Sequence, residues 1–238
     1  MQVDILVLAA HPDDAELACS GTILKHLSLG DKVAIVDLTK GERGTRGTIE
    51  TRAAEAATAS KIMGISAREN LGLPDCFFEN SYEHQLKVIY AIRKYRPQIV
   101  LCNAIDDRHP DHGRAARLAA EACFLAGLRK IETFEGEQLQ EAWRPKVVYH
   151  YIQDRYIKPD FVVDVSEFMD TKMEVIKAYK TQFYDPQSDE PITYIASADF
   201  LESITSRARE LGKVIGARFG EGFTVERLPG VNSLFDLK

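Results

Sequence analysis

Short apolar runs alternate with segments of helical spacing along the first half of the chain, and this alternation most restricts the fold. The apolar runs, at residues 3–9, 32–38 and 98–102, have the length and composition of buried strands. The helical segments are residues 15–29, 50–63, 82–95 and 113–126. Continuous apolar strands alternating with helices are typical of a parallel sheet covered on both faces. We therefore predict an α/β fold with a doubly wound, mostly parallel, Rossmann-like sheet.

The second half of the chain is less regular. Residues 146–152 and 161–165 have the pattern of further strands, and residues 166–179 and 199–217 that of additional C-terminal helices. No internal repeat, low-complexity stretch or linker-like change of composition divides the chain. We expect a single domain over residues 1–238.

Composition excludes several classes of protein. With 45% hydrophobic and 28% charged residues, the chain is neither disordered nor a coiled coil. Its net charge of −6 lacks the basic footprint of a nucleic-acid binder, so we expect no nucleic-acid partner. The N-terminal apolar run has Asp4 near its start and no basic leader, which indicates neither a signal peptide nor a membrane span. The four cysteines are scattered as in a reduced, cytoplasmic protein, and we expect no membrane partner.

The first strand is followed by a histidine and two carboxylates where a dinucleotide-binding protein has glycines. The residues are His11-Pro12-Asp13-Asp14, and no G-x-G-x-x-G is present. Ligands of open α/β sheets bind beyond the carboxyl ends of the strands. The loop therefore favours a cation over a nucleotide, although a nucleotide-binding Rossmann protein stays an alternative.

A second cluster follows the strand at 98–102 and contains His109, Asp111 and His112. We expect the strands at 3–9 and 98–102 to be neighbours at the switch point of the sheet, so that both clusters meet. Two histidines and one aspartate are a suitable ligand set for Zn²⁺, with a coordination position left open for water. A further carboxylate and histidine remain for general acid–base catalysis. Either cluster alone would also fit a helix N-cap, and a metal-binding protein without catalysis is a second alternative.

The two motifs together resemble the LmbE/PIG-L family of zinc-dependent N-acetylglucosamine deacetylases. Ala10-His11-Pro12-Asp13-Asp14 pairs with His109-Pro110-Asp111-His112, and residues 39–47 and 50–55 are also similar to family segments. Within the family, residues 144–151 and 176–183 resemble the branch that deacetylates N-acetylglucosaminyl-malate in bacillithiol biosynthesis. Another N-acetylglucosamine-containing small molecule or a chitooligosaccharide is the alternative substrate.

The resemblance implies a ligand set of His11, Asp14 and His112 for one zinc ion, and the H-x-x-D spacing supports it. Fe²⁺ or another divalent ion also suits these ligands. Asp13 is implied to be the general base that takes a proton from water.

Two further residues complete the implied chemistry. His109 is expected to stabilise the oxyanion, while Asp111 is expected to fix the tautomer of His109. Either Asp13 or His109 would give a proton to the leaving amine.

Four residues are candidates for substrate binding. Glu42 is suited to sugar hydroxyls, and Arg52 and Arg108 to the malate carboxylates. The alternative for the arginines is a surface role, such as a helical pair of Arg52 with Glu55. Tyr194 lies in a polar stretch, residues 185–196, that we expect to form a lid. We expect the protein to be a homo-oligomer that associates through its C-terminal helices.

Overall fold

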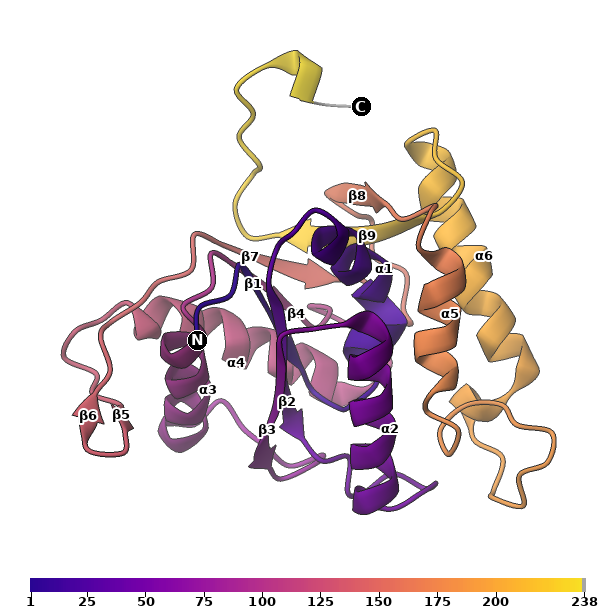
Figure 1. Cartoon of the computed structure of the whole chain (residues 1–238), viewed down its shortest axis with the longest axis horizontal. Coiled ribbons are helices and arrows are strands. Elements are labelled where there is room, and N and C mark those ends of the chain that lie inside the picture. Colours follow the sequence, from indigo (N-terminus) through magenta and orange to yellow (C-terminus); the bar gives the residue numbers. More distant parts are fainter. Residues whose placement is uncertain (237–238) are drawn as a thin grey trace.

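A seven-stranded mixed sheet forms the centre of the computed structural model, which describes residues 1–236 (Figure 1). The strand order is β3-β2-β1-β4-β7-β9-β8. The strands are β1 (Ile5–Ala9), β2 (Val33–Thr39), β3 (Ala67–Leu73), β4 (Ile99–Cys102), β7 (Val147–Tyr151), β8 (Phe161–Asp164) and β9 (Gly220–Val225). A separate small hairpin pairs β5 (Phe134–Glu135) with β6 (Gln138–Leu139).

The prediction of a doubly wound, mostly parallel sheet is confirmed. Strands β3, β2, β1, β4 and β7 are parallel, and β9 pairs antiparallel with both β7 and β8. The predicted neighbours β1 and β4 are paired, with Leu8 opposite Cys102. The carboxyl ends of these two strands therefore open onto the same edge of the sheet.

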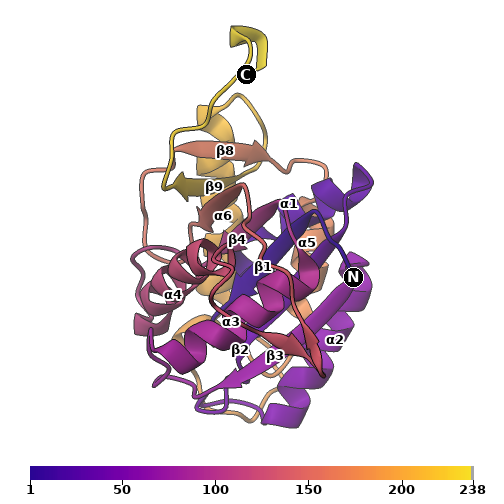
Figure 2. The same ribbon diagram turned by 90° about the vertical axis from the view of Figure 1, so that its left-hand side faces the viewer.

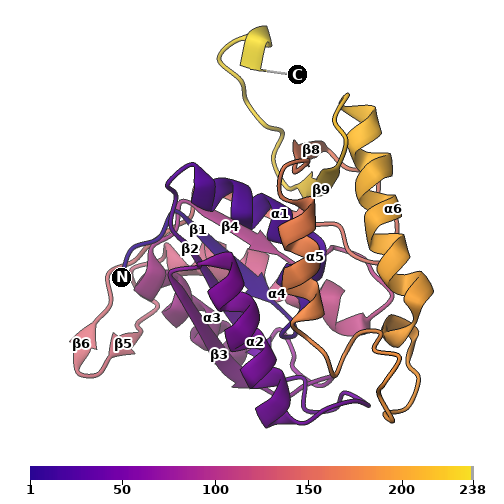
Figure 3. The same cartoon turned by 45° about the vertical axis from the view of Figure 1, so that its right-hand side comes forward.

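Six helices cover both faces of the sheet, as predicted (Figures 2 and 3). They are α1 (Asp14–Ser28), α2 (Ile49–Met63), α3 (Tyr82–Tyr95), α4 (Pro110–Ala126), α5 (Met169–Lys177) and α6 (Ala198–Val214). One apolar core joins α1, α2, α5 and α6 to Ile5, Val7 and Ala9 of β1. The other joins α3 and α4 to Leu6 and Leu8. Alternate residues of β1 thus supply both cores, which explains its continuous apolar sequence.

Two strands of the sheet did not stand out in the sequence, each for its own reason. Edge strand β3 is polar, and its Arg68 lies over the sheet to contact Asp37 and Glu16. Strand β9 contains Gly220, where a Cβ atom would lie 2.5 Å from a side-chain carbon of Val162. Close packing therefore requires glycine at this position, and glycine has a low strand propensity, so the sequence does not predict the strand. Within the described residues, no helix is long and apolar enough to cross a lipid bilayer.

Helix α1 is interrupted at Cys19, and a buried carboxylate caps the part that follows. Cys19 has non-helical dihedral angles (φ −137°, ψ 16°). The backbone N–H groups of Gly21 and Thr22 donate to the carboxylate of Glu221, on β9, at 2.9 and 2.7 Å. Lys172 on α5 contacts the same carboxylate at 2.6 Å, and both charged side chains are buried. This carboxylate therefore links α1, α5 and β9 and holds the helix that begins at Asp14.

We expect the Glu221→Gln substitution to destabilise the protein by about 3–5 kcal/mol, because Lys172 would be left as an unpaired buried charge. The amide would also meet two N–H donors with only one acceptor oxygen. Urea unfolding followed by circular dichroism measures the change. Glu210→Gln, at an exposed position of α6, is the matched control and should change stability by no more than about 0.5 kcal/mol. Equal stability of the two variants would contradict the capping role.

Candidate metal centre and active site

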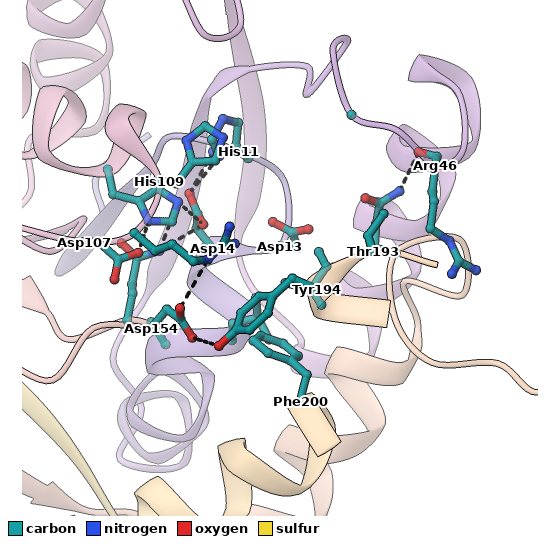
Figure 4. A pocket seen from close by; sticks show the side chains of 18 of the residues that line it. His11, Asp13, Asp14, Arg46, Asp107, His109, Asp154, Thr193, Tyr194 and Phe200 are labelled. Carbon is teal, nitrogen blue, oxygen red and sulfur yellow. Dashed lines mark hydrogen bonds and ion pairs between the residues drawn. The ribbon is translucent and has the colours of Figure 1, made fainter. Parts of the chain in front are cut away.

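A pocket of about 250 Å³ lies at the carboxyl ends of the parallel strands. The loops that follow β1, β2, β3, β4 and β7 all contribute to its wall, and the segment around Tyr194 closes one side. Figure 4 shows His11, His109 and Asp14 together in this pocket, with Asp154 and Tyr194 beside them. The two clusters singled out in the sequence therefore meet in one site.

The three predicted metal ligands lie in contact with one another. One carboxylate oxygen of Asp14 is 3.5 Å from Nδ1 of His11, and the other is 3.0 Å from Nε2 of His112. His11 follows β1, Asp14 begins α1, and His112 lies in the first turn of α4. All three residues are buried. Two imidazole nitrogens thus face the same carboxylate from different elements.

The other ring nitrogen of each of these histidines is held by a carboxylate. Nδ1 of His112 lies 2.5 Å from Asp107, and Nε2 of His11 lies 3.1 Å from Asp75 and 3.2 Å from Asp111. In metal sites, the second nitrogen of a ligating imidazole typically donates to a carboxylate, which fixes the ring and raises its basicity. The residues therefore fit a divalent ion bound by His11 Nδ1, His112 Nε2 and Asp14. His109 also brings a ring nitrogen within 4.8 Å of those of His11 and His112.

The electrostatics of the cluster suit a cation. Burial lowers the pKa of His112, but the charge of Asp14 and the hydrogen bond with Asp107 outweigh it and raise the pKa to about 9. Burial likewise opposes ionisation of Asp14, yet the facing histidines hold its pKa well below the usual range. The neighbouring carboxylates therefore favour the protonated form of the His11 and His112 imidazoles when no metal is bound. A divalent ion would replace these protons, so that binding is expected to release them.

Asp13, the predicted general base, is buried in a strained conformation. Its φ of 128° lies in the left-handed region that non-glycine residues rarely adopt. The guanidinium of Arg52 donates to its carboxylate at 2.8 Å and to the carbonyl of Pro12 at 2.7 Å. Burial raises the pKa of Asp13 to about 7, although Arg52 opposes this shift. A carboxyl group with this pKa can exchange protons near neutral pH.

His109 caps the N-terminus of α4. Its Nδ1 accepts the backbone N–H of Asp111 at 3.3 Å, so the neutral ring carries its proton on Nε2. Burial and the neighbouring histidines His11 and His112 lower the pKa of His109. The expectation that the Asp111 side chain fixes this tautomer is wrong. Its carboxylate instead bonds to His11, to the backbone N–H of Cys76 and to Arg114, while the backbone of Asp111 serves His109.

The predicted substrate-binding residues have different surroundings. Tyr194 lines the pocket, donates to Asp154 at 3.1 Å and lies under the guanidinium of Arg108, 4.5 Å from the ring centroid. Arg108 also lines the pocket and bonds to Asp154. Arg52 lines the pocket, but its guanidinium is engaged with Asp13 and does not pair with Glu55 as the alternative supposed.

Glu42 lies outside the set of pocket-lining residues. Its exposed carboxylate accepts the backbone N–H of Asp75 at 2.8 Å. Glu42 therefore supports the loop that carries Asp75, and its contact with sugar hydroxyls stays a prediction.

Four residues of the site did not emerge from the sequence. Asp107 and Asp75 orient the imidazoles of His112 and His11, while the side-chain amides of Asn103 and Gln153 donate to Asp14. Asp107 precedes His112 by five residues in the loop after β4, and this short spacing is the sequence feature that could have indicated their contact. Asp75 and Gln153 follow strands β3 and β7, so only the sheet order brings them here.

Comparisons with known proteins find similarity over most of the chain. The PIG-L family profile, described as GlcNAc-PI de-N-acetylase, matches residues 6–123. The crystal structure of the conserved protein TT1542 from Thermus thermophilus is 35% identical, with a TM-score of 0.86 over 98% of this chain and 99% of that chain.

Two curated relatives differ in the substrates that their names give. Diacetylchitobiose deacetylase of Thermococcus kodakarensis is 28% identical over 95% of this chain and 84% of its own length. The probable N-acetyl-alpha-D-glucosaminyl L-malate deacetylase 2 of Bacillus anthracis is 26% identical over 75% and 81%, respectively.

We expect the Asp107→Asn substitution to weaken Zn²⁺ binding by about 10- to 100-fold, because His112 would lose the carboxylate that orients it. Competition with a chromogenic chelator measures the affinity. Asp106→Asn is the matched control, since Asp106 is exposed and pairs with Arg155 outside the pocket. Its affinity should stay within about twofold of the original protein. An equal loss in both variants would show that Asp107 does not act through His112.

Proposed function

Because the chain belongs to the PIG-L family of GlcNAc-type deacetylases, we propose that it is a zinc-dependent enzyme that removes the acetyl group from a small N-acetylglucosamine conjugate. One observation carries this proposal. Asp13 and His109, neither of them needed as a ligand, line the same pocket as the His11, Asp14 and His112 cluster. A structural zinc site normally fills all four coordination positions with protein ligands and has no free acid or base beside it. This observation argues against a metal-binding protein without catalysis.

The proposed ion is held by His11, Asp14 and His112. When bound there, zinc supplies Lewis acidity for the amide carbonyl and lowers the pKa of water. Fe²⁺ is an alternative, because the same nitrogen and oxygen donors accept several divalent ions.

The proposed chemistry of the protein groups follows from their hydrogen bonds. Asp13 takes the proton of the attacking water, while Arg52 holds its carboxylate and keeps it ionised. The Nε2–H of neutral His109 donates to the carbonyl oxygen as negative charge develops on it. Protonated Asp13, whose pKa is about 7, then returns its proton to the leaving amine. The products are acetate and a free glucosamine amine.

For the substrate, we propose N-acetylglucosaminyl-malate, the intermediate of bacillithiol biosynthesis, and two arginines of the pocket that lack a carboxylate partner support it. The five arginines that line the pocket are Arg43, Arg46, Arg52, Arg108 and Arg207. Arg52 is paired with Asp13, and Asp154 serves both Arg108 and Arg207. Arg43 and Arg46 have no carboxylate partner within residues 1–236. A dicarboxylate such as malate would complement this charge. Diacetylchitobiose is the alternative, on the strength of the relative that matches 95% of the chain.

A substrate panel tests the proposal. We expect the zinc-loaded protein to release acetate from N-acetylglucosaminyl-malate with a kcat/KM at least about tenfold above that for diacetylchitobiose or free N-acetylglucosamine. Acetate is measured by a coupled enzymatic assay. Faster turnover of diacetylchitobiose would overturn the malate assignment alone. Absence of acetate release from every N-acetylglucosamine conjugate, with zinc bound, would overturn the deacetylase assignment.

The Asp13→Asn variant is the internal control for the panel. The amide keeps the shape of the side chain but accepts no proton, so acetate release should fall by about 10²-fold or more. Zinc content, measured by mass spectrometry, should stay near one ion per chain. Parallel loss of zinc and activity would mean that Asp13 is a ligand.

We further propose that residues 1–238 act as one deacetylase domain in a cytoplasmic homo-oligomer. In place of the C-terminal helices expected from the sequence, we propose that the contact surface is the segment after β9. This segment leaves the body of the molecule (Figures 1 and 3), and a second copy would cover its apolar side chains. Leu228, Leu234 and Phe235 are 84%, 82% and 98% exposed. Such clusters of exposed apolar side chains mark interaction surfaces.

Light scattering after size-exclusion chromatography tests the association. The original protein should elute as an oligomer, and the double variant Leu234→Ser, Phe235→Ser should have the mass of one chain. Leu29→Ser is the control, because Leu29 is also exposed (68%) but lies at the end of α1. A monomeric original protein, or an oligomeric double variant, would contradict the proposal.

A further inference from the structure

Two side-chain amides donate hydrogen bonds to the carboxylate of Asp14. The Nδ2 group of Asn103, at the end of β4, donates to Oδ2 at 3.0 Å, and the Nε2 group of Gln153, after β7, donates to Oδ1 at 3.0 Å. The backbone N–H of His11 also donates to Oδ2, at 2.9 Å. Asn103 and Gln153 are buried, with 0% and 6% exposure. Each oxygen of the central metal ligand is therefore oriented by an amide from a different strand.

Backbone N–H groups, which can only donate, fix which end of each amide faces Asp14. The backbone N–H of Ala10 donates to Oδ1 of Asn103 at 2.8 Å, and the backbone N–H of Ala104 donates to Oε1 of Gln153 at 3.1 Å. A backbone N–H only donates, so it meets the oxygen of each amide and leaves the NH₂ group facing Asp14. Asn103 also donates to Oε1 of Gln153 at 3.0 Å, which joins the two amides.

Gln153 lies against the ligand nitrogen as well. Its Nε2 is 3.4 Å from Nε2 of His112, and the residue lines the pocket. A carboxylate in this place would lie within reach of the same ion as Asp14 and His112 and act as a fourth protein ligand. The neutral amide instead offers only hydrogens toward the ligands. The coordination position needed for water or substrate is thereby left open.

We propose that Gln153 is a positioning residue that sets the affinity of the metal site, through its hold on Asp14, and keeps the fourth coordination position free of protein. The inference rests on the ligand set of the proposed function, but not on the substrate. It gives Gln153 a role that is distinct from contact with the acetylated sugar. Asn103, which is wholly buried, acts as the support that fixes Gln153.

The test is the affinity for Zn²⁺ alone, measured by chelator competition on the full chain. Gln153→Met keeps the length of the side chain but removes its donor, and we expect zinc to bind about 10- to 100-fold more weakly. Gln153→Glu adds an oxygen ligand, and we expect zinc to bind at least about tenfold more tightly while acetate release is lost. Gln182→Met is the matched control. Gln182 is buried and lines the same pocket, but it donates to the carbonyl of Arg46, so its zinc affinity should change by less than about twofold.

The outcomes separate this inference from the proposed reaction. An unchanged zinc affinity in Gln153→Met, or an equal loss in Gln182→Met, overturns it. If Gln153→Met does not fold by circular dichroism, Gln153→Glu decides: tighter binding supports the inference, and equal or weaker binding overturns it. A protein that releases no acetate but shows these affinity changes would refute the deacetylase assignment and leave the role of Gln153 in place.

Discussion

The parallel pairing of β1 with β4 is the constraint on which the rest of the site depends. It brings the loops after two strands, separated by about ninety residues, to one edge of the sheet. The helices that follow go to opposite faces, since α1 packs in one core and α4 in the other. A crevice must form where the two loops part. His11 and Asp14 enter it from one side and His112 from the other, so the pairing of the strands brings the proposed metal ligands together, while the strained backbone of Asp13 lies between the first two.

The concentration of charge in this crevice explains why it suits a cation. Five buried carboxylates surround the histidines: Asp13, Asp14, Asp75, Asp107 and Asp111. Arg52 offsets Asp13, and Arg114 offsets Asp111. The remaining carboxylates face imidazoles, whose pKa values are raised in consequence. A divalent ion at His11, Asp14 and His112 would supply the positive charge that balances these carboxylates, in place of protons on the imidazoles. Asp13 would then remain available as the proposed base.

The sequence predicts the site residues that directly follow recognisable apolar strands. It does not predict those that follow an unrecognised strand or that depend on the order of the strands in the sheet. The ligands follow two recognisable apolar strands, so the sheet rule located them. Asp75 follows β3, whose polar residues conceal a strand, and Gln153 reaches Asp14 only because β7 lies beside β4. The spacing of Arg52 and Glu55 fits a helical ion pair, but Glu55 accepts from the backbone and side chain of Thr181 instead. A sequence also cannot show that the side chain of Asp111 contacts His11 while its backbone N–H donates to His109.

The proposed catalytic residues are concentrated in the first half of the chain, whereas the wall of the pocket comes from both halves. Every proposed metal ligand, the base Asp13 and His109 lie within residues 6–123, the span that the family profile matches. Asp154, Tyr194 and Arg207, which line the same pocket, lie beyond it and come from the half where β9 pairs antiparallel with β7 and β8. The family profile therefore includes all the residues that we propose to hold the ion and to move protons. Relatives named for a chitobiose and for a malate conjugate both match this chain. Arg43 and Arg46, which we propose to meet the malate carboxylates, lie inside the span of the family profile, whereas Asp154, Tyr194 and Arg207 lie beyond it, so both halves of the chain shape the part of the pocket that receives the substrate.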